Sequence, residues 1–183
     1  MFFERLKKSP KNRFVILIVI FGLVIVLIVY FLIFMPIEGS VPTYGILDYE
    51  FAWTQSRVEN ILSVWGVEGI NKQSLAIYWD FIYIVGYVSL ALGLIILILR
   101  ISEEKIQKIG FYFTLTPFLT GLFDIIENIN LLIMLSDPIS ISNFNPFIAS
   151  LSALIKFSFL FAAIAYFLVA LTIAIFKKFK QRE

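Results

Sequence analysis

The residues of this sequence best suited to chemistry lie inside its third long apolar segment. Asp124, Glu127 and Asn128 follow one another at helical spacing, so their side chains share one face of a helix. Ionisable groups at membrane depth cost about 2.5 kcal/mol or more each, and they are seldom found there without a partner or a function. Buried carboxylates of this kind can attract a cation or exchange protons.

A lysine in the fourth apolar segment is the predicted partner of these acids. Counted from the centre of its segment, Lys156 lies close in depth to Glu127. Charges in one layer of a membrane compensate one another, so we expect Lys156 to face Asp124 or Glu127. One lysine cannot neutralise two carboxylates. A proton on one acid, a shared proton or a cationic ligand would complete the balance.

Further polar and aromatic side chains stand at the start of the second apolar segment. Asp80, Tyr83 and Tyr87 fall on one face of the expected helix. Tyrosines at this position are typical of the aromatic belt of membrane proteins, and their rings also offer faces to a cation. The predicted binding residues are therefore Asp80, Tyr83, Tyr87, Asp124, Glu127, Asn128 and Lys156.

The chain contains no cysteine and no histidine, which narrows the available chemistry. Disulfides, thiolate catalysis and histidine-based triads are excluded, as are zinc or haem sites that need these ligands. No phosphate-binding loop or metal-ligand motif is present either. We predict no metal and no cofactor, and the remaining reactive groups are carboxylate, lysine, tyrosine and hydroxyl.

The elements that must position these residues are four long apolar blocks. Soluble domains are about 45–50% apolar, whereas 60% of these 183 residues are hydrophobic and the mean hydropathy is +0.93. Each block is longer than the roughly 20 residues that cross a bilayer core. The expected spans are 14–35, 76–100, 110–135 and 147–176. The prediction is an all-α integral membrane four-helix bundle forming a single domain over residues 1–183, because isolated strands cannot satisfy their backbone in hydrocarbon.

The positive charges predict the orientation of this bundle. Of the fifteen Lys and Arg residues, five precede the first span, three lie between the second and third spans, and four follow the fourth, so twelve share one side. The positive-inside rule places both termini and the 101–109 loop in the cytoplasm of a multi-pass cell-membrane protein. Contact with anionic membrane lipid explains the basic ends, and no nucleic-acid partner is predicted.

One sizeable external loop, residues 36–75, is expected to contain a short amphipathic helix at 54–66. Ser56 and Glu59 form a capping-box pattern, apolar residues follow at helical spacing, and Gly66 is placed to end the helix. This helix would lie on the outer membrane surface or over the mouth of the bundle. It could act as a lid over a site, or as a packing cap that shields helix ends.

Two spans carry further structural signals. The first span, 14–35, is almost entirely apolar with Gly22 as its one small residue, so we expect it at the edge of the bundle, facing lipid. In the third span, Pro117 is expected to kink the helix near its start, because proline frees a backbone carbonyl.

Several functions fit these residues. The leading hypothesis is an outward-facing intramembrane pocket that binds a small molecule, a cation or a lipid. An alternative is a membrane-embedded enzyme in which one carboxylate delivers a proton to a lipid or isoprenoid while its neighbour accepts one. The polar residues can also serve only to hold helices together, at about 0.6 kcal/mol per contact.

A further alternative is an accessory subunit of a larger membrane complex. The external loop would then dock a membrane-protein partner or a second copy of this chain. Asp48, Glu50 and Trp53 are the candidate contacts, and their structural role would be to fold the loop against the bundle.

Four sequence patterns in fixed order resemble a group of small four-helix prokaryotic membrane proteins without an assigned function. They are Leu47-Asp48-Tyr49-Glu50-Phe51-Ala52, Trp65-Gly66, Asp80-Phe81-Ile82-Tyr83-Ile84-Val85-Gly86-Tyr87 and Asp124-Ile125-Ile126-Glu127-Asn128. The resemblance covers about residues 45–135 and implies a recurring architecture. A more distant, fold-level likeness is to the emopamil-binding and sigma-2-like proteins, whose helices hold acids in a bundle cavity; it transfers no residues.

Overall fold

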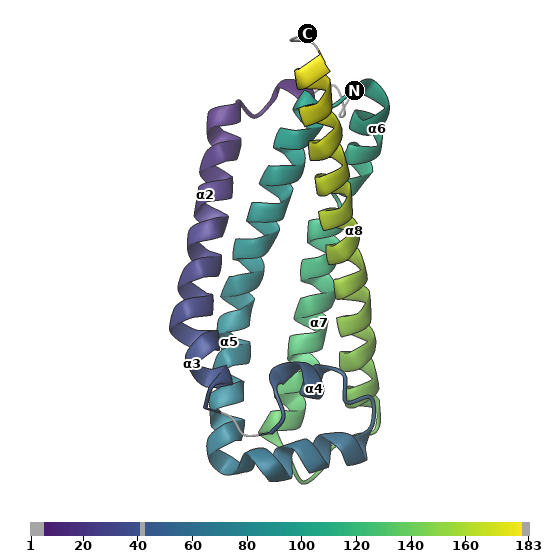
Figure 1. Cartoon of the computed structure of the whole chain (residues 1–183). Helices are drawn as coiled ribbons and strands as arrows, with labels where there is room; N and C mark the ends of the chain where they lie inside the picture. Colours follow the sequence, from purple (N-terminus) through teal and green to yellow (C-terminus); the bar gives the residue numbers. More distant parts are fainter. Residues whose placement is uncertain (1–5, 41–42, 181–183) are drawn as a thin grey trace.

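The computed structural model describes residues 6–40 and 43–180, and the secondary structure in these residues is helical (Figure 1). Its elements are α2 (Asn12–Val29), η1 (Tyr30–Phe34), α3 (Met35–Glu38), α4 (Ile46–Glu50), α5 (Gln55–Ile101), α6 (Glu104–Phe113), α7 (Thr116–Ser136) and α8 (Phe144–Lys180). Four stretches are long and apolar enough to cross a membrane, namely Asn12–Glu38, Gln55–Ile101, Glu104–Ser136 and Phe144–Lys180. The prediction of an all-α chain with four long apolar helices is confirmed.

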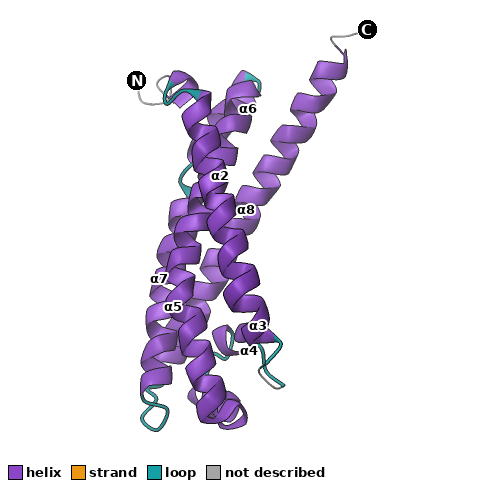
Figure 2. Cartoon of the chain, turned by 90° about the vertical axis from the view of Figure 1, so that its left-hand side faces the viewer, coloured by secondary structure: helices purple, strands orange, loops and turns teal. Residues whose placement is uncertain are grey.

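The helices form a bundle in which α5 is central. It packs against α2 on one side and against α7 and α8 on the other, while α7 and α8 pack closely together. The start of α2 and the end of α8, next to the two termini, lie at the same end of the bundle (Figure 1). Figure 2 shows the C-terminal part of α8 leaning away from the other helices at that end.

Helix α2 lies at the edge of the bundle, as its composition predicts. Its buried residues, Val15, Gly22 and Val29, recur every seven positions and form one narrow stripe. The stripe faces α5 at close range, because a Cβ on Gly22 would lie 2.5 Å from the carbonyl oxygen of Gly86. Glycine is required at this crossing.

The end of the first span contains a wide turn that the sequence analysis did not anticipate. Residues Tyr30–Phe34 form a π-helix, in which the Met35 amide donates to the Tyr30 carbonyl oxygen. Pro36 follows directly and has no amide hydrogen to continue the regular pattern. Such single π turns are frequent at functional sites, and this one belongs to the wall of the cavity described below.

The amphipathic helix expected at 54–66 is present as the first part of α5. Thr54, not Ser56, caps it: the Thr54 hydroxyl accepts a hydrogen bond from the Arg57 amide. The predicted capping box of Ser56 with Glu59 is therefore wrong by two positions. At Gly66 the backbone turns with φ 60° and ψ −174°, a conformation that only glycine adopts readily. The helix then resumes at once, so residues 67–75, expected in the loop, are helical.

The first part of α5 runs across the end of the bundle opposite the termini (Figure 1). Its apolar stripe is buried, as the spacing predicts, and packs against residues of α4, α7 and α8. The cluster contains Tyr49, Val58, Ile61, Leu62, Trp65, Leu131, Met134, Leu135 and Ala149. Trp65 also donates its indole N–H to the Tyr44 carbonyl oxygen at 2.8 Å. The segment therefore closes the ends of the other helices.

The third span is two helices rather than one. Helix α6 ends at Phe113, and α7 begins at Thr116 with Pro117 in its first turn. The break lies at the position where the proline predicts a kink. It leaves α7 as a separate helix that carries all three polar residues of the acidic segment.

Candidate functional site

The acidic segment of α7 points into the bundle. Asp124, Glu127 and Asn128 are exposed by only 4%, 0% and 3%. Apolar neighbours on the other faces of α7, such as Leu122 and Ile129, are exposed instead. Helix periodicity therefore places the polar side chains inside, as predicted, and each of them needs a partner there.

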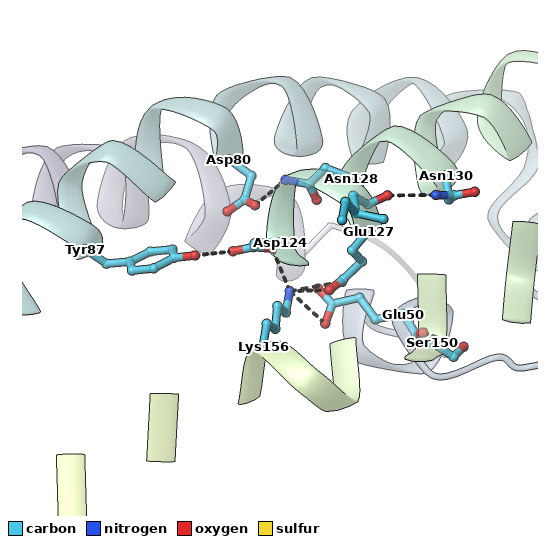
Figure 3. Close-up of polar contacts among 10 residues, drawn as sticks. Glu50, Asp80, Tyr87, Asp124, Glu127, Asn128, Asn130, Ser150 and Lys156 are labelled. Carbon is cyan, nitrogen blue, oxygen red and sulfur yellow. Dashed lines mark hydrogen bonds and ion pairs between the residues drawn. The ribbon is translucent and has the colours of Figure 1, made fainter. Parts of the chain in front are cut away.

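Lys156 of α8 supplies the expected partner. Its amine nitrogen Nζ lies 2.8 Å from Asp124 Oδ1 and donates a hydrogen bond to it. Both oxygens of Glu127 lie 2.9 Å from the same nitrogen, although only Oε1 accepts with hydrogen-bond geometry. Figure 3 shows the three side chains meeting between α7 and α8. The predicted ion pair is present, and it includes both acids.

A third carboxylate reaches the same amine, and the sequence analysis did not place it there. Glu50 Oε2 lies 3.6 Å from Lys156 Nζ, and the residue is only 9% exposed. The hypothesis that Glu50 contacts a partner protein from the loop surface does not fit this burial. The alternative given with it, a loop folded against the bundle, does.

Hydrogen bonds between residues that are far apart in sequence hold Glu50 in position. The Ser150 hydroxyl of α8 donates to the Glu50 carbonyl oxygen at 2.7 Å and accepts from the Trp53 amide at 2.9 Å. The Tyr49 hydroxyl donates to the Leu131 carbonyl oxygen of α7 at 3.0 Å. Helix α4 is thus fixed to both α7 and α8. The signal in the sequence was an acid flanked by aromatic residues in a loop.

The cluster carries more negative than positive charge. Glu50, Asp124 and Glu127 surround one lysine, which leaves a formal excess of two negative charges if all are ionised. Burial raises the pKa of the Glu50 carboxyl above its ordinary value; the Lys156 amine opposes this shift and Asp124 adds to it. Glu50 lies outside the four spans, so water that reaches the end of the bundle can supply its proton.

Two further hydrogen bonds connect the cluster to α5. The Tyr87 hydroxyl donates to Asp124 Oδ2 at 2.7 Å, and the Asn128 side-chain amide donates to Asp80 Oδ2 at 2.6 Å (Figure 3). Tyr87 therefore acts through its hydroxyl group here. The network joins α4, α5, α7 and α8.

A cavity of about 510 Å³ lies beside this network, at the end of the bundle opposite the termini. Its size falls in the range of about 300–1,000 Å³ that is usual for small-molecule sites. The lining comes from η1, α3, α4, α5, α7 and α8 and from the residue before α4. It consists of Tyr30, Phe34, Ile37, Glu38, Gly45, Ile46, Leu47, Glu50, Gln73, Ala76, Ile77, Asp80, Tyr83, Asn128 and Phe157.

The cavity separates the predicted site residues into two groups. Asp80, Tyr83 and Asn128 line it. The other four, Tyr87, Asp124, Glu127 and Lys156, are absent from the lining and form the network behind it. Glu50 belongs to both, because it lines the cavity and contacts Lys156.

Of the two roles considered for the 54–66 helix, a lid or a packing cap, the lid is not observed. None of the residues that line the cavity comes from that segment; α3 and α4 cover it instead. The reason is that the apolar stripe of the 55–65 helix is already occupied by α4, α7 and α8. That segment is a packing cap.

The acids of this site are not arranged as metal ligands. Among residues 6–40 and 43–180, no group of three or more Asp or Glu side chains could hold a metal ion.

Comparisons of the sequence with family models, with curated proteins and of the fold with solved structures find no match.

Proposed function

We propose that this chain is a multi-pass protein of the cell membrane, with both termini in the cytoplasm, whose outward-facing cavity binds a small organic cation with an apolar body. The observation that carries the proposal is the lining of the cavity: Glu50 and Asp80 offer carboxylates within a wall that is otherwise mostly aliphatic and aromatic.

The membrane location is supported by length, composition and charge. Four stretches are long and apolar enough to span a bilayer, and the large side chains on the outer faces of α2 and α8 are exposed. A soluble protein would not leave so much apolar surface in water. The termini and their basic residues share one end of the bundle, which the positive-inside rule assigns to the cytoplasm.

The cationic character of the ligand follows from the charges around the cavity. Three acids line it, Glu38, Glu50 and Asp80, and no lysine or arginine is part of the lining. The aromatic ring of Tyr83 also lines the cavity and can attract a cation, by about 0.5–2 kcal/mol. The Phe157 ring already lies 5.0 Å from the Lys156 amine. An anion or a phosphate headgroup would meet repulsion here.

The experiment compares two probes of the same shape and different charge. Benzyltrimethylammonium carries a permanent positive charge, and neopentylbenzene is its uncharged carbon analogue. We expect the cation to raise the unfolding temperature of the purified chain in lipid nanodiscs. At about one hundred times its Kd it would stabilise the folded state by about 2.7 kcal/mol, whereas the neutral probe would have little effect.

Matched carboxylate-to-amide variants locate the binding site. Asp80→Asn should weaken the response to the cation, because it removes a charge that lines the cavity. Glu59→Gln should leave it unchanged, because Glu59 is exposed on the capping segment and outside the cavity. Equal stabilisation by both probes would contradict the cationic ligand class, and no response to either would contradict the binding function.

The enzymatic and accessory interpretations remain predictions. Glu38, Glu50 and Asp80 are the acids that could reach a lipid or isoprenoid in the cavity, but this arrangement suits binding and proton transfer alike. Glu50 is buried in the bundle, so it is no longer a candidate contact for a docking partner.

A further inference from the structure

Two buried carboxylate oxygens in the cluster have no hydrogen-bond donor. They are Glu50 Oε2 and Glu127 Oε2. They lie 3.6 Å and 2.9 Å from the same Lys156 amine nitrogen, and Figure 3 shows both carboxyl groups at that amine. Two carboxylates supply only acceptors, so the pair lacks the hydrogen that would join it. A proton shared between them satisfies both oxygens and removes one negative charge.

The cavity side of this pair is open to a ligand. Glu50 lines the cavity while its carboxylate contacts the cluster. Gln73 lines it too, is only 3% exposed, and forms no hydrogen bond with any described residue through its side-chain amide. Among the described residues, the two glutamate oxygens are the buried polar atoms without a partner, so the Gln73 amide opens onto the cavity, where water or a ligand can pair with it.

We propose that binding of a cation in the cavity releases one proton from the Glu50–Glu127 pair. The proposal rests on the proposed function, and it adds that the site exchanges charge instead of simply accumulating it. Without a ligand, the proton shared by the two carboxyl groups lowers the charge of the cluster. With a ligand, the cation performs the same role from the cavity side.

The exchange is balanced in charge and atoms. The O–H bond of the protonated Glu50–Glu127 pair breaks, its electron pair stays on the carboxylate, and the proton leaves to water through the cavity. The positive charge of the ligand takes its place beside Glu50. No other reactant is needed, because one positive charge enters the site as one leaves.

The charged and titratable groups around Glu50 explain why the pair holds this proton. They are Asp124 and Glu127 of α7, Lys156 of α8, Asp80 and Tyr83 of α5, and Glu38 of α3. Lys156 is the one cation among them. It donates to Asp124 and Glu127 at 2.8 and 2.9 Å but is 3.6 Å from Glu50, so Glu50 is the acid whose charge is least compensated.

The test is isothermal titration of the full chain in nanodiscs with benzyltrimethylammonium, repeated in buffers of different ionisation enthalpy. This quaternary ammonium probe has no titratable proton, so any proton that is released comes from the protein. We plot the measured heat against the ionisation enthalpy of the buffer. We expect a slope of about one proton released per cation bound at a pH where the pair still holds its proton. The affinity should also rise about tenfold per pH unit until the pair is fully ionised.

Two variants separate the proton from the binding site. Glu50→Gln keeps the shape of the side chain but cannot share a titratable proton, so the slope should fall to zero. Asp80→Asn should weaken binding and keep the slope, because Asp80 lines the cavity but lies outside the pair.

The outcomes distinguish this proposal from the function on which it rests. Binding without proton release in the unmodified chain would overturn the exchange and leave the cation site standing. Proton release that persists in Glu50→Gln would overturn the assignment to Glu50. If that variant does not fold, an affinity of the unmodified chain that is independent of pH would overturn the exchange by itself. No binding of the cation would overturn both proposals.

Discussion

At the scale of residues, Lys156 has the largest number of charged partners in the site. It contacts Glu50, Asp124 and Glu127 within 3.6 Å. Removing one partner from a buried ion pair leaves an uncompensated charge, which costs much more than the pair contributes. The free energy of unfolding should therefore depend strongly on this one amine.

Lys156→Met tests this dependence. We expect it to lower the free energy of unfolding by about 3–5 kcal/mol, measured by chemical denaturation in detergent micelles. The control is Lys72→Met, which removes a lysine paired at 2.6 Å with the exposed Glu68 and should cost less than about 1 kcal/mol. Equal losses in the two variants would show that the buried cluster does not depend on its lysine.

Glu50 gives the protein a pH dependence of stability. Its folded-state pKa is raised by burial, so the folded chain binds a proton more tightly than the unfolded chain does. The stabilisation from this group is present below the ordinary pKa of a glutamate and is lost as the pH rises through the raised value. Between about pH 5 and about pH 8, the unfolding temperature should fall, and Glu50→Gln should flatten that fall. A wild-type curve that rises over this interval would contradict the prediction.

Part of the site could be predicted from residue type and spacing. The cost of ionisable groups in an apolar segment was enough to predict that Asp124 and Glu127 face Lys156. Glu50 could not be found in this way. Its position depends on a hydrogen bond to Ser150, one hundred residues away, and no local pattern encodes that contact.

At the scale of elements, the turn at Gly66 divides α5 into two parts with different structural roles. Before it, the helix caps the bundle; after it, the helix carries Gln73, Asp80 and Tyr83 to the cavity. Gly66 was a sufficient signal for the end of the first part. The immediate restart was not predictable, because the residues after Gly66 are too polar to be recognised as part of a membrane span.

Gly66→Ala should strain this turn. Its φ of 60° and ψ of −174° suit glycine alone, and we expect the variant to lose about 1–3 kcal/mol of stability. Gly39→Ala is the control, because Gly39 has φ −68° and should tolerate alanine within about 0.5 kcal/mol. Thermal unfolding followed by circular dichroism measures both. A Gly66→Ala protein as stable as the control would show that the helices can join in another way.

At the scale of the whole molecule, the four apolar blocks were sufficient to predict the helical bundle, because hydrophobic length is recorded directly in the sequence. The cavity was not predictable in the same way. Its walls come from six elements of the fold, so its shape depends on how helices cross and on the π turn before Pro36.

The absence of cysteine allows a direct test of the orientation. Ser63 is exposed on the capping segment and Ser9 is exposed near the other end of the bundle. With both termini cytoplasmic, a maleimide that cannot cross membranes should label Ser63→Cys in intact cells. It should label Ser9→Cys only after the membrane is permeabilised. The reverse pattern would mean that the cavity opens to the cytoplasm.

The lone lysine of the cluster also constrains how the chain enters a bilayer. The α6–α7 stretch is the least apolar of the four, with a hydropathy of 1.6 against 2.6 for α8. As the ribosome delivers it, its two acids emerge before the lysine that pairs with them. Each acid then opposes transfer from the translocon into lipid by about 2.5–3.5 kcal/mol.

The two helices should therefore leave the translocon together, as a hairpin joined by the short turn after Ser136. An insertion assay on chains that end before or after α8 measures this directly. We expect the third span to integrate poorly in the shorter chain and fully in the longer one, and less well again when the longer chain carries Lys156→Met. Equal integration of all three would mean that each helix crosses the membrane on its own.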